Sequence, residues 1–400
     1  MRFTSPHLAL FLAPSLLLVA GVSTAQGPTT VTAWNDLGMH CIDPDFSVFS
    51  LLPPYNNVHA QLVVGGVLQR LPGSYTVSYR ALGDPQGSIN VSSIGKTNFW
   101  AHVQDLFGVA LPPDIGLAGY AMPGPSNVAQ LMGFDTTWSW FRAEGIPITP
   151  IDDAGAKNPY PLMEVTVRNA AGVVVASTRT TVPTSSEMTC SECHASNASP
   201  FARPQAGWVR HADPVKDDHL NILRLHDELN AGDPLYASAL ADAGYAPGGL
   251  LETVQVNGVA VLCDRCHFSN ALGIGMSGIT PMTQAIHGRH AGVMNLGGDT
   301  LEAISGRDGC YSCHPGRDTQ CLRGAMGKAI GADGDFAMQC QSCHGSMSAV
   351  GSPTREGWFD EPNCQSCHTG SATHNNGEIR YTSVYEPNGV PRQAVSALFA

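Results

Sequence analysis

Cys340-Gln341-Ser342-Cys343-His344 is one of five stretches in the chain that read Cys-x-x-Cys-His. The other four are Cys190–His194, Cys263–His267, Cys310–His314 and Cys364–His368. A CxxC pair alone also suits half a zinc site, a redox-active dithiol or a disulfide, but none of these requires histidine after the second cysteine. With 15 histidines in 400 residues, five such placements by accident have odds on the order of one in ten million. The repeated histidine therefore indicates one shared chemical role.

The five motifs predict covalent attachment of c-type haem. Both cysteines of a motif bind the vinyl groups of one haem as thioethers, and the adjacent histidine binds its iron. The sequence thus predicts five covalently attached haems. The predicted haem-binding cysteines are Cys190, Cys193, Cys263, Cys266, Cys310, Cys313, Cys340, Cys343, Cys364 and Cys367. The predicted proximal iron ligands are His194, His267, His314, His344 and His368.

Each iron also takes a sixth ligand or keeps an open site. Histidines outside the motifs are numerous enough to serve every iron. We expect the sixth ligands to be His219, His226, His287, His290 and His374, with His40 and His211 as reserves. His219 and His226 share one face of a predicted helix, and the three-residue spacing of His287 and His290 suits two neighbouring haems. For each of them, an ordinary packed or solvated histidine is the alternative.

Methionine is the competing axial ligand. The haem half contains Met276, Met282, Met294, Met326, Met338 and Met347. We expect most of them to pack against the macrocycles, and a mixed His/Met haem stays open. The motifs also crowd together toward the C-terminus, so the last three haems are expected to pack closely.

The first 25 residues predict a signal peptide. Arg2 supplies the positive charge, Leu8–Val22 is almost wholly apolar, and Ser23-Thr24-Ala25 provides the small residues of a cleavage site. A membrane anchor is the alternative, but the apolar stretch is short and contains Pro14. We therefore expect an exported protein, located in the periplasm, at the outer surface or outside the cell, with no integral membrane segment after cleavage.

Residues 26–185 predict a β-rich, haem-free domain. Val58–Val64 and Tyr75–Tyr79 read as strands, and Met163–Arg168 and Val173–Thr178 flank a turn sequence as in a hairpin. A long irregular insertion rich in Gly and Pro is expected around 110–160. The domain is predicted to be sandwich-like.

Residues 186–375 predict a multihaem domain of short helices and loops with little regular structure. One helix is clear, over Pro214–Leu229, with Asp213 as the N-cap and Asn230 and Gly232 at its end. Residues 376–400 contain no motif and are expected to form a C-terminal tail.

The formal net charge of −12 and the absence of any Lys/Arg run argue against nucleic acid or an anionic membrane as a partner. Redox partner proteins or a terminal electron acceptor are expected instead, and an oligomer stays open. Outside the motifs are two cysteines, Cys41 and Cys321. They could form a disulfide, or Cys321 could approach an iron.

Several stretches resemble the secreted multihaem c-type cytochromes of metal-reducing and other environmental bacteria. They are Trp34-Asn35-Asp36-Leu37-Gly38-Met39-His40-Cys41, Cys310–Gly316 followed by Cys321–Met326, and the closely spaced motifs at Cys340 and Cys364. The resemblance spans most of the chain and implies electron transfer in the periplasm or at the cell surface. Similar proteins often continue with further haem motifs, so the resemblance suggests a shortened relative.

Three functions remain in view. The first is an electron carrier that passes electrons through five haems to a redox partner or an extracellular acceptor. The second is a multihaem oxidoreductase with one open haem, which the uniform CxxCH motifs and the surplus of histidine disfavour. The third is a filament-forming or surface-docking cytochrome.

Overall fold

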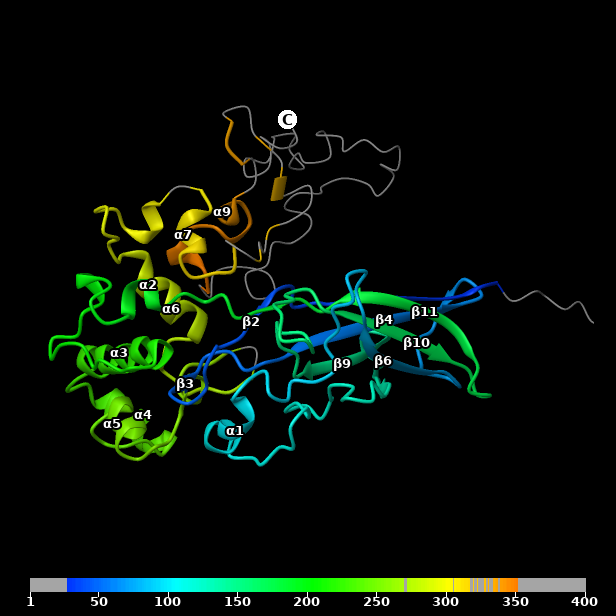
Figure 1. Ribbon diagram of the computed structural model, residues 1–400, viewed down its shortest axis with the longest axis horizontal. Helices are drawn as coiled ribbons and strands as arrows, with labels where there is room; N and C mark the ends of the chain where they lie inside the picture. Colours follow the sequence, from blue (N-terminus) through cyan, green and yellow to red (C-terminus); the bar gives the residue numbers. More distant parts are fainter. Residues whose placement is uncertain are drawn as a thin grey trace, which may run out of the picture.

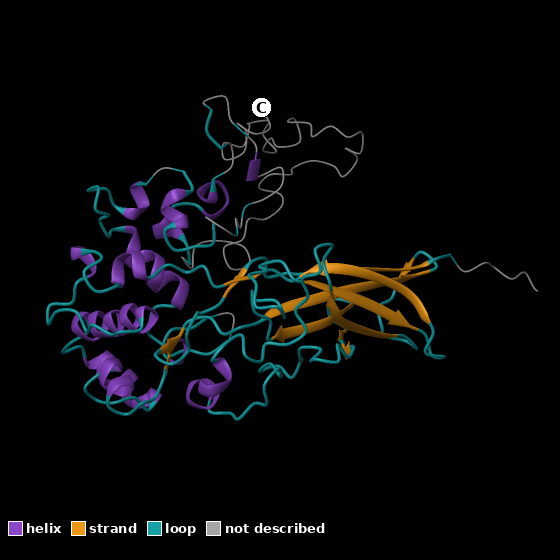
Figure 2. Ribbon diagram, viewed as in Figure 1, coloured by secondary structure: helices purple, strands orange, loops and turns teal. Residues whose placement is uncertain are grey.

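The computed structural model describes residues 27–351, with gaps at 270–271, 305, 317–318, 320–321, 323–326, 329, 331–333 and 337–338. The predicted signal peptide, the fifth motif and the C-terminal tail lie outside the described residues. Figure 2 shows the long strands gathered on one side of the molecule and the helices on the other. In the described chain, the β-rich region therefore comes first in the sequence and the helical region follows it.

Two antiparallel sheets make up the β-rich region (Figure 1). The first contains β1 (Thr29–Trp34), β4 (Asn56–Val64), β9 (Trp140–Ile146) and β8 (Gly133–Asp135), with β5 (Val67–Leu68) also paired to β4. The second contains β11 (Val174–Thr181), β10 (Leu162–Arg168), β6 (Thr76–Leu82) and β7 (Gln130–Leu131).

Side chains from both sheets fill one hydrophobic core. Strand β10 alternates buried and half-buried residues, which is the two-residue period of a strand with one face covered. Its Met163 and Val165 share that core with Tyr79 of β6 and with Leu62 and Phe141 of the other sheet. The prediction of a β-rich N-terminal region with antiparallel pairing is confirmed.

The hairpin and the strands predicted from alternation are present, but the irregular insertion over 110–160 was predicted wrongly in part. Strand β9 runs through it and pairs with β4 at the centre of the first sheet. Phe141 and Ala143 point into the core, whereas Gly145 has a φ of 74°, which favours glycine. That break, together with the surrounding glycines and prolines, hides the strand from a search for regular alternation.

Two short parallel pairings connect the β-rich region to the later chain. Strand β2 (His40–Cys41) pairs with β12 (Thr184–Ser185), and β3 (Phe49–Ser50) pairs with β13 (Val261–Leu262). Phe46 packs with the residues of α1 (Phe99–Phe107) and with Leu262 in a further hydrophobic cluster. Residues from the first fifty positions are therefore part of the core beneath the second motif.

The helices are short. Their bounds are α2 (Ser191–His194), η1 (Pro200–Ala202), α3 (Pro214–Leu229), α4 (Pro234–Ala243), α5 (Leu250–Gln255), η2 (Cys263–Arg265), α6 (Met282–Ala291), η3 (Leu301–Ala303), α7 (Asp308–Tyr311), α9 (Cys340–His344) and η4 (Met347–Ala349). In the described part of the chain, no helix is long and apolar enough to cross a membrane.

Helix α3 confirms the helix predicted from its end signals. The Asp213 side chain accepts hydrogen bonds from the backbone N–H groups of Val215 and Lys216, and Pro214 occupies the first turn. A carboxylate at this position satisfies donors that have no partner within the helix and complements the helix dipole. This helix is the longest element of the helical region and positions two of the motifs.

Candidate functional site

The first three Cys-x-x-Cys-His motifs share one local geometry. In each, the backbone N–H of the histidine donates to the carbonyl of the first cysteine, which closes one helical turn. These bonds join His194 to Cys190 (2.9 Å), His267 to Cys263 (3.0 Å) and His314 to Cys310 (2.9 Å). Residues three and four apart on a helical turn lie on one face, so the two cysteines and the histidine of each motif share one side of their turn.

Each of these three histidines lies close to a second histidine from elsewhere in the chain. The ring centroids are 6.2 Å apart for His194 and His290, 6.3 Å for His226 and His267, and 5.8 Å for His287 and His314. His226 belongs to α3, whereas His287 and His290 both belong to α6. The structure therefore brings together three histidine pairs, and every pair joins a motif to a helix.

The separation within each pair is the one that a shared metal would need. An imidazole nitrogen binds a metal ion at about 2 Å and lies about 1.2 Å from its own ring centre, so two imidazoles on opposite sides of one metal have centroids about 6.4 Å apart. The angle between the ring planes is 79°, 87° and 12° in the three pairs. All three angles suit axial ligation, because each ring can rotate about its bond to the metal.

Hydrogen bonding fixes the tautomer of one histidine in each pair. Nδ1 lies 2.7 Å from the Ile286 carbonyl in His290, 2.7 Å from the Thr280 carbonyl in His267 and 2.8 Å from the Thr283 carbonyl in His287. A carbonyl only accepts, so Nδ1 donates and Nε2 keeps the lone pair. This second-sphere arrangement is the usual one for a histidine that binds a metal through Nε2.

The histidines opposite them are held neutral. Burial, and after it the facing His290, lowers the pKa of His194 to about 4. Burial, and after it the facing His287, likewise lowers the pKa of His314 to about 4. Burial also lowers the pKa of His226, and the described residues give no hydrogen-bond partner to the buried Nδ1 atoms of His194 and His226. Neutral imidazole is the form that binds a metal.

His219 has different surroundings. Its buried ring stacks on Phe49 with centroids 4.0 Å apart, and Nε2 lies 3.7 Å from Oδ1 of Asp218. Within the described chain, the ring contact of His219 is with Phe49 and not with a motif histidine. Its role as a sixth ligand stays a prediction.

The two reserve histidines lie away from the three pairs. His40 is buried, with Nε2 3.0 Å from the Pro53 carbonyl, so this nitrogen donates and holds the proton. His211 is exposed beside the start of α3, where its Nδ1 accepts from the backbone N–H of Asp213 at 3.0 Å.

The fourth motif is described only in part and the fifth not at all. Helix α9 covers the fourth motif, and His344 lies close enough to His314 to contribute to lowering its pKa, after burial and His287. The predicted site residues Cys364, Cys367, His368 and His374 lie outside the described residues, as does Cys321. Cys41 is buried in β2, and its pairing with Cys321 stays a prediction.

Three buried acids lie around the first two motifs, and the sequence analysis did not single them out. Burial raises the pKa of Asp43 and of Asp218 to about 7 each, and that of Asp264 to about 6. Asp43 still accepts hydrogen bonds from the backbone N–H groups of Leu51 and Leu52. A buried acid of this kind favours its neutral form, because the charged form loses its hydration.

The second motif lies against an apolar cluster. Cys263, Cys266 and Met276 pack on the core formed by α3, α4 and β13, and the Met276 N–H donates to the Cys266 carbonyl at 2.9 Å. The expected packing of Met276 against a macrocycle stays a prediction. Met326 and Met338 lie outside the described residues.

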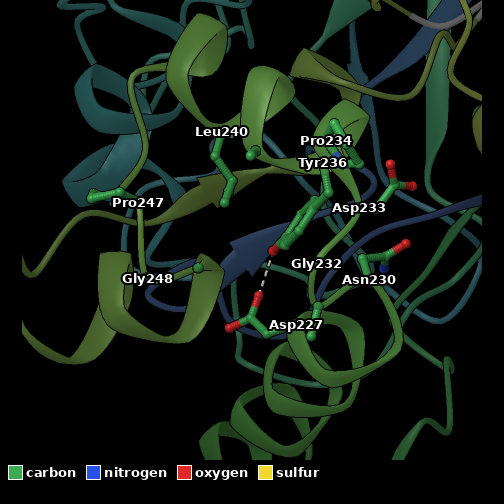
Figure 3. Close-up of a pocket in the computed structure, with 12 residues that line it drawn as sticks. Asp227, Asn230, Gly232, Asp233, Pro234, Tyr236, Leu240, Pro247 and Gly248 are labelled. Carbon is green, nitrogen blue, oxygen red and sulfur yellow. Dashed lines mark hydrogen bonds between the residues drawn. The ribbon is translucent and has the colours of Figure 1, made fainter.

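A pocket of about 270 Å³ lies where α3, α4 and α5 meet (Figure 3). The Tyr236 hydroxyl points at the Asp227 carboxylate and donates a hydrogen bond to it. The same carboxylate accepts from the backbone N–H groups of Leu250 and Leu251, at 2.9 and 3.0 Å. These polar groups therefore satisfy one another and hold α5 against α3. The pocket borders the second motif's site, since Tyr236 also contacts the His226 ring at 5.4 Å.

The donor set suits an axially ligated haem iron. The described residues contain no group of three or more His, Cys, Asp or Glu side chains that could hold a bare metal ion. A haem supplies the equatorial nitrogens itself and takes only two axial ligands from protein. Two facing imidazoles beside a CxxC pair meet that requirement.

Comparison of the chain with known protein families, with characterised proteins and with solved structures found no match.

Proposed function

We propose that this chain is an exported multihaem c-type cytochrome that carries electrons through five covalently bound haems to a redox partner or an extracellular acceptor. The observation that carries the proposal is the presence of three histidine pairs, each beside a Cys-x-x-Cys stretch and each at the separation of two axial ligands. A disulfide role for the cysteines gives no reason for the facing histidines, and a zinc site of two cysteines and two histidines would need a cluster of donors that the described residues do not form.

The chain's residues have distinct roles under this proposal. Cys190 and Cys193 would hold a haem by thioether bonds, and His194 and His290 would bind its iron. The second site would use Cys263 and Cys266 with His267 and His226, and the third would use Cys310 and Cys313 with His314 and His287. Bound haem would supply a reversible one-electron couple, and its potential would depend on burial and on hydrogen bonds to these histidines.

The pairing of these histidines favours electron transfer over catalysis. Two protein ligands at an iron leave no open position for a substrate, and all three described pairs offer two. We further propose that the two sheets of the N-terminal region form a sandwich that contributes residues to the base of the haem-bearing region. No membrane-crossing helix is present in the part of the chain that the structure describes.

The test is a haem count on the exported, purified protein. Intact-mass spectrometry should show five haems, and Cys263→Ala/Cys266→Ala should show four. Cys41→Ala is the matched control, since Cys41 lies outside every motif, and it should keep five. A protein that binds zinc stoichiometrically and carries no haem would refute the proposal.

Spin state tests the ligand assignments. The oxidised protein should be low-spin at its first three sites, and His226→Ala should convert one haem to a high-spin form that binds carbon monoxide when reduced. His211→Ala, which alters an exposed histidine of the same region, should leave the spectrum unchanged. A high-spin haem in the unaltered protein would favour an enzyme, and polymers in a size measurement would favour a filament.

A further inference from the structure

Helix α6 serves two motifs that are far apart in the sequence. His287 and His290 are three residues apart on it, so they lie on one face. His290 faces His194 of the first motif, and His287 faces His314 of the third. The first and third motifs must therefore be neighbours, even though the second motif lies between them in the chain.

Direct contacts join the same two motifs. The Thr189 hydroxyl, next to Cys190, donates to the Ser312 carbonyl within the third motif at 2.6 Å. Burial raises the pKa of the Cys190 thiol to about 12, and the charges of Asp218 and then Cys313 add to this effect. The two attachment turns thus lie against each other.

The fourth motif continues from the third. The Gln341 side chain donates to the Gly306 carbonyl, just before α7, at 2.9 Å. The Cys310 and Cys340 side chains lie within hydrogen-bonding distance of each other. In Figure 1, α9 follows α7 on the side away from α2.

The second motif lies on the other side of the first. Helix α3 contacts both: the Asn221 amide donates to the His194 carbonyl at 3.0 Å, and His226, further toward the C-terminal end, faces His267. Pairing of β13 with β3 fixes the start of the second motif at β3. In Figure 1, α2 and α3 lie at a level between β3 and α7.

We infer that the first four attachment sites follow one another in space in the order second, first, third and fourth, so that electrons pass directly between the first and third sites across α6. The inference rests on the proposed function. Each transfer converts one ferrous iron to ferric and the neighbouring ferric iron to ferrous, with no bond made or broken. The external donor would be a reduced one-electron redox protein, and the external acceptor would be an oxidised redox protein or another oxidant outside the chain.

Redox titration of methionine variants tests this order, because methionine in place of an axial histidine raises the potential of that one site. The informative pair is His287→Met with His290→Met, made singly and together. The control pair is His287→Met with His226→Met, which alters the third and second sites. In a double variant the two altered sites have the highest potentials, so they are reduced before the others. The second of these two sites gains its electron beside a site that has already gained one, and that negative charge lowers its potential.

For His287→Met with His290→Met, the lower of the two raised potentials in the double variant should fall well below the potential of the same site in its single variant. For the control pair the departure from additivity should be smaller, since the Coulomb interaction weakens with distance. The inferred order would be overturned if the control pair departed from additivity as strongly as the α6 pair. It would also be overturned if His287→Met and His290→Met raised the potential of the same site.

Removal of whole sites gives an independent measurement if a methionine variant loses its haem. Cys190→Ala/Cys193→Ala should displace two of the remaining potentials, and Cys263→Ala/Cys266→Ala should displace one. An arrangement in chain order predicts the reverse. A protein without any haem mass would instead refute the proposed function, whereas haem-loaded variants with the reverse pattern would refute only the order.

Discussion

Replacement of Asn221 by alanine tests how α3 holds the first motif. The Asn221 side chain is 0% exposed. Its Nδ2 donates to the His194 carbonyl at 3.0 Å and to Oγ of Ser196 at 3.2 Å, and its Oδ1 accepts from the Val209 N–H at 2.7 Å. One amide therefore joins α3 to the first attachment turn and to the loop before the helix.

The expected loss follows from the groups that alanine leaves without a partner. Removal of the amide strips the Val209 N–H and the His194 carbonyl of hydrogen bonds in the interior. Each such group costs about 1–3 kcal/mol, so we expect the free energy of unfolding to fall by about 3 kcal/mol. The Ser196 Oγ loses only a donor, and its own hydrogen bond to Asp217, at 2.8 Å, is kept.

Urea unfolding followed by the helical circular dichroism signal measures this loss, because α3, α4 and α6 all belong to the same region. Asn257→Ala is the matched control, since Asn257 is exposed, and it should change the free energy by less than about 0.5 kcal/mol. A comparably small effect of Asn221→Ala would show that α3 does not hold the first motif through this amide.

Three further predictions concern the helix cap, the core and pH. Asp213→Ala removes the side-chain cap of α3 and should cost about 1 kcal/mol in thermal unfolding; an unchanged midpoint would count against the cap. Met163→Ala, at a position 0% exposed between the sheets, should cost about 3 kcal/mol in urea unfolding, and a loss below about 1 kcal/mol would mean that this core collapses around the change. The pKa of Asp43 is raised from 3.8 to about 7, so the folded chain binds its proton more tightly than the unfolded chain does. The stability that this proton contributes is complete below pH 3.8 and is lost as the pH rises through about 7. Asp43→Asn should flatten that part of the fall in melting temperature; parallel profiles for the two proteins would contradict the assignment.

Local signals explain the elements that were predicted correctly. Helix α3 is specified by Asp213 and Pro214 at its start, where a side-chain acceptor and a fixed φ act within one turn. The hairpin of β10 and β11 is specified by alternation and a tight turn. Strand β9 was missed because its regular stretch is interrupted at Gly145, and its burial depends on β4, which lies far away in the sequence.

The candidate site also has parts that local sequence signals specify and parts that depend on contacts between distant residues. The motifs could be read directly, since attachment needs a fixed local spacing. The pairing of His290 with His194 and of His287 with His314 depends on where α6 docks, and α6 has no side-chain N-cap and contains Gly288. Nothing local specifies the position of such a helix, so the partners of its histidines could not be read from their spacing alone.

The two-residue pairings of β2 with β12 and of β3 with β13 have a consequence for how the chain folds. Phe49 obtains its strand partner only when Val261 arrives, long after the rest of the β-rich region has left the ribosome. Such distant pairing raises the contact order and slows folding. Residues 46–50 should therefore stay accessible to chaperones and proteases until the second motif is in place. A chain cut after residue 185 would leave Phe46 and Phe49 without their contacts to residues 260–262, as an apolar patch.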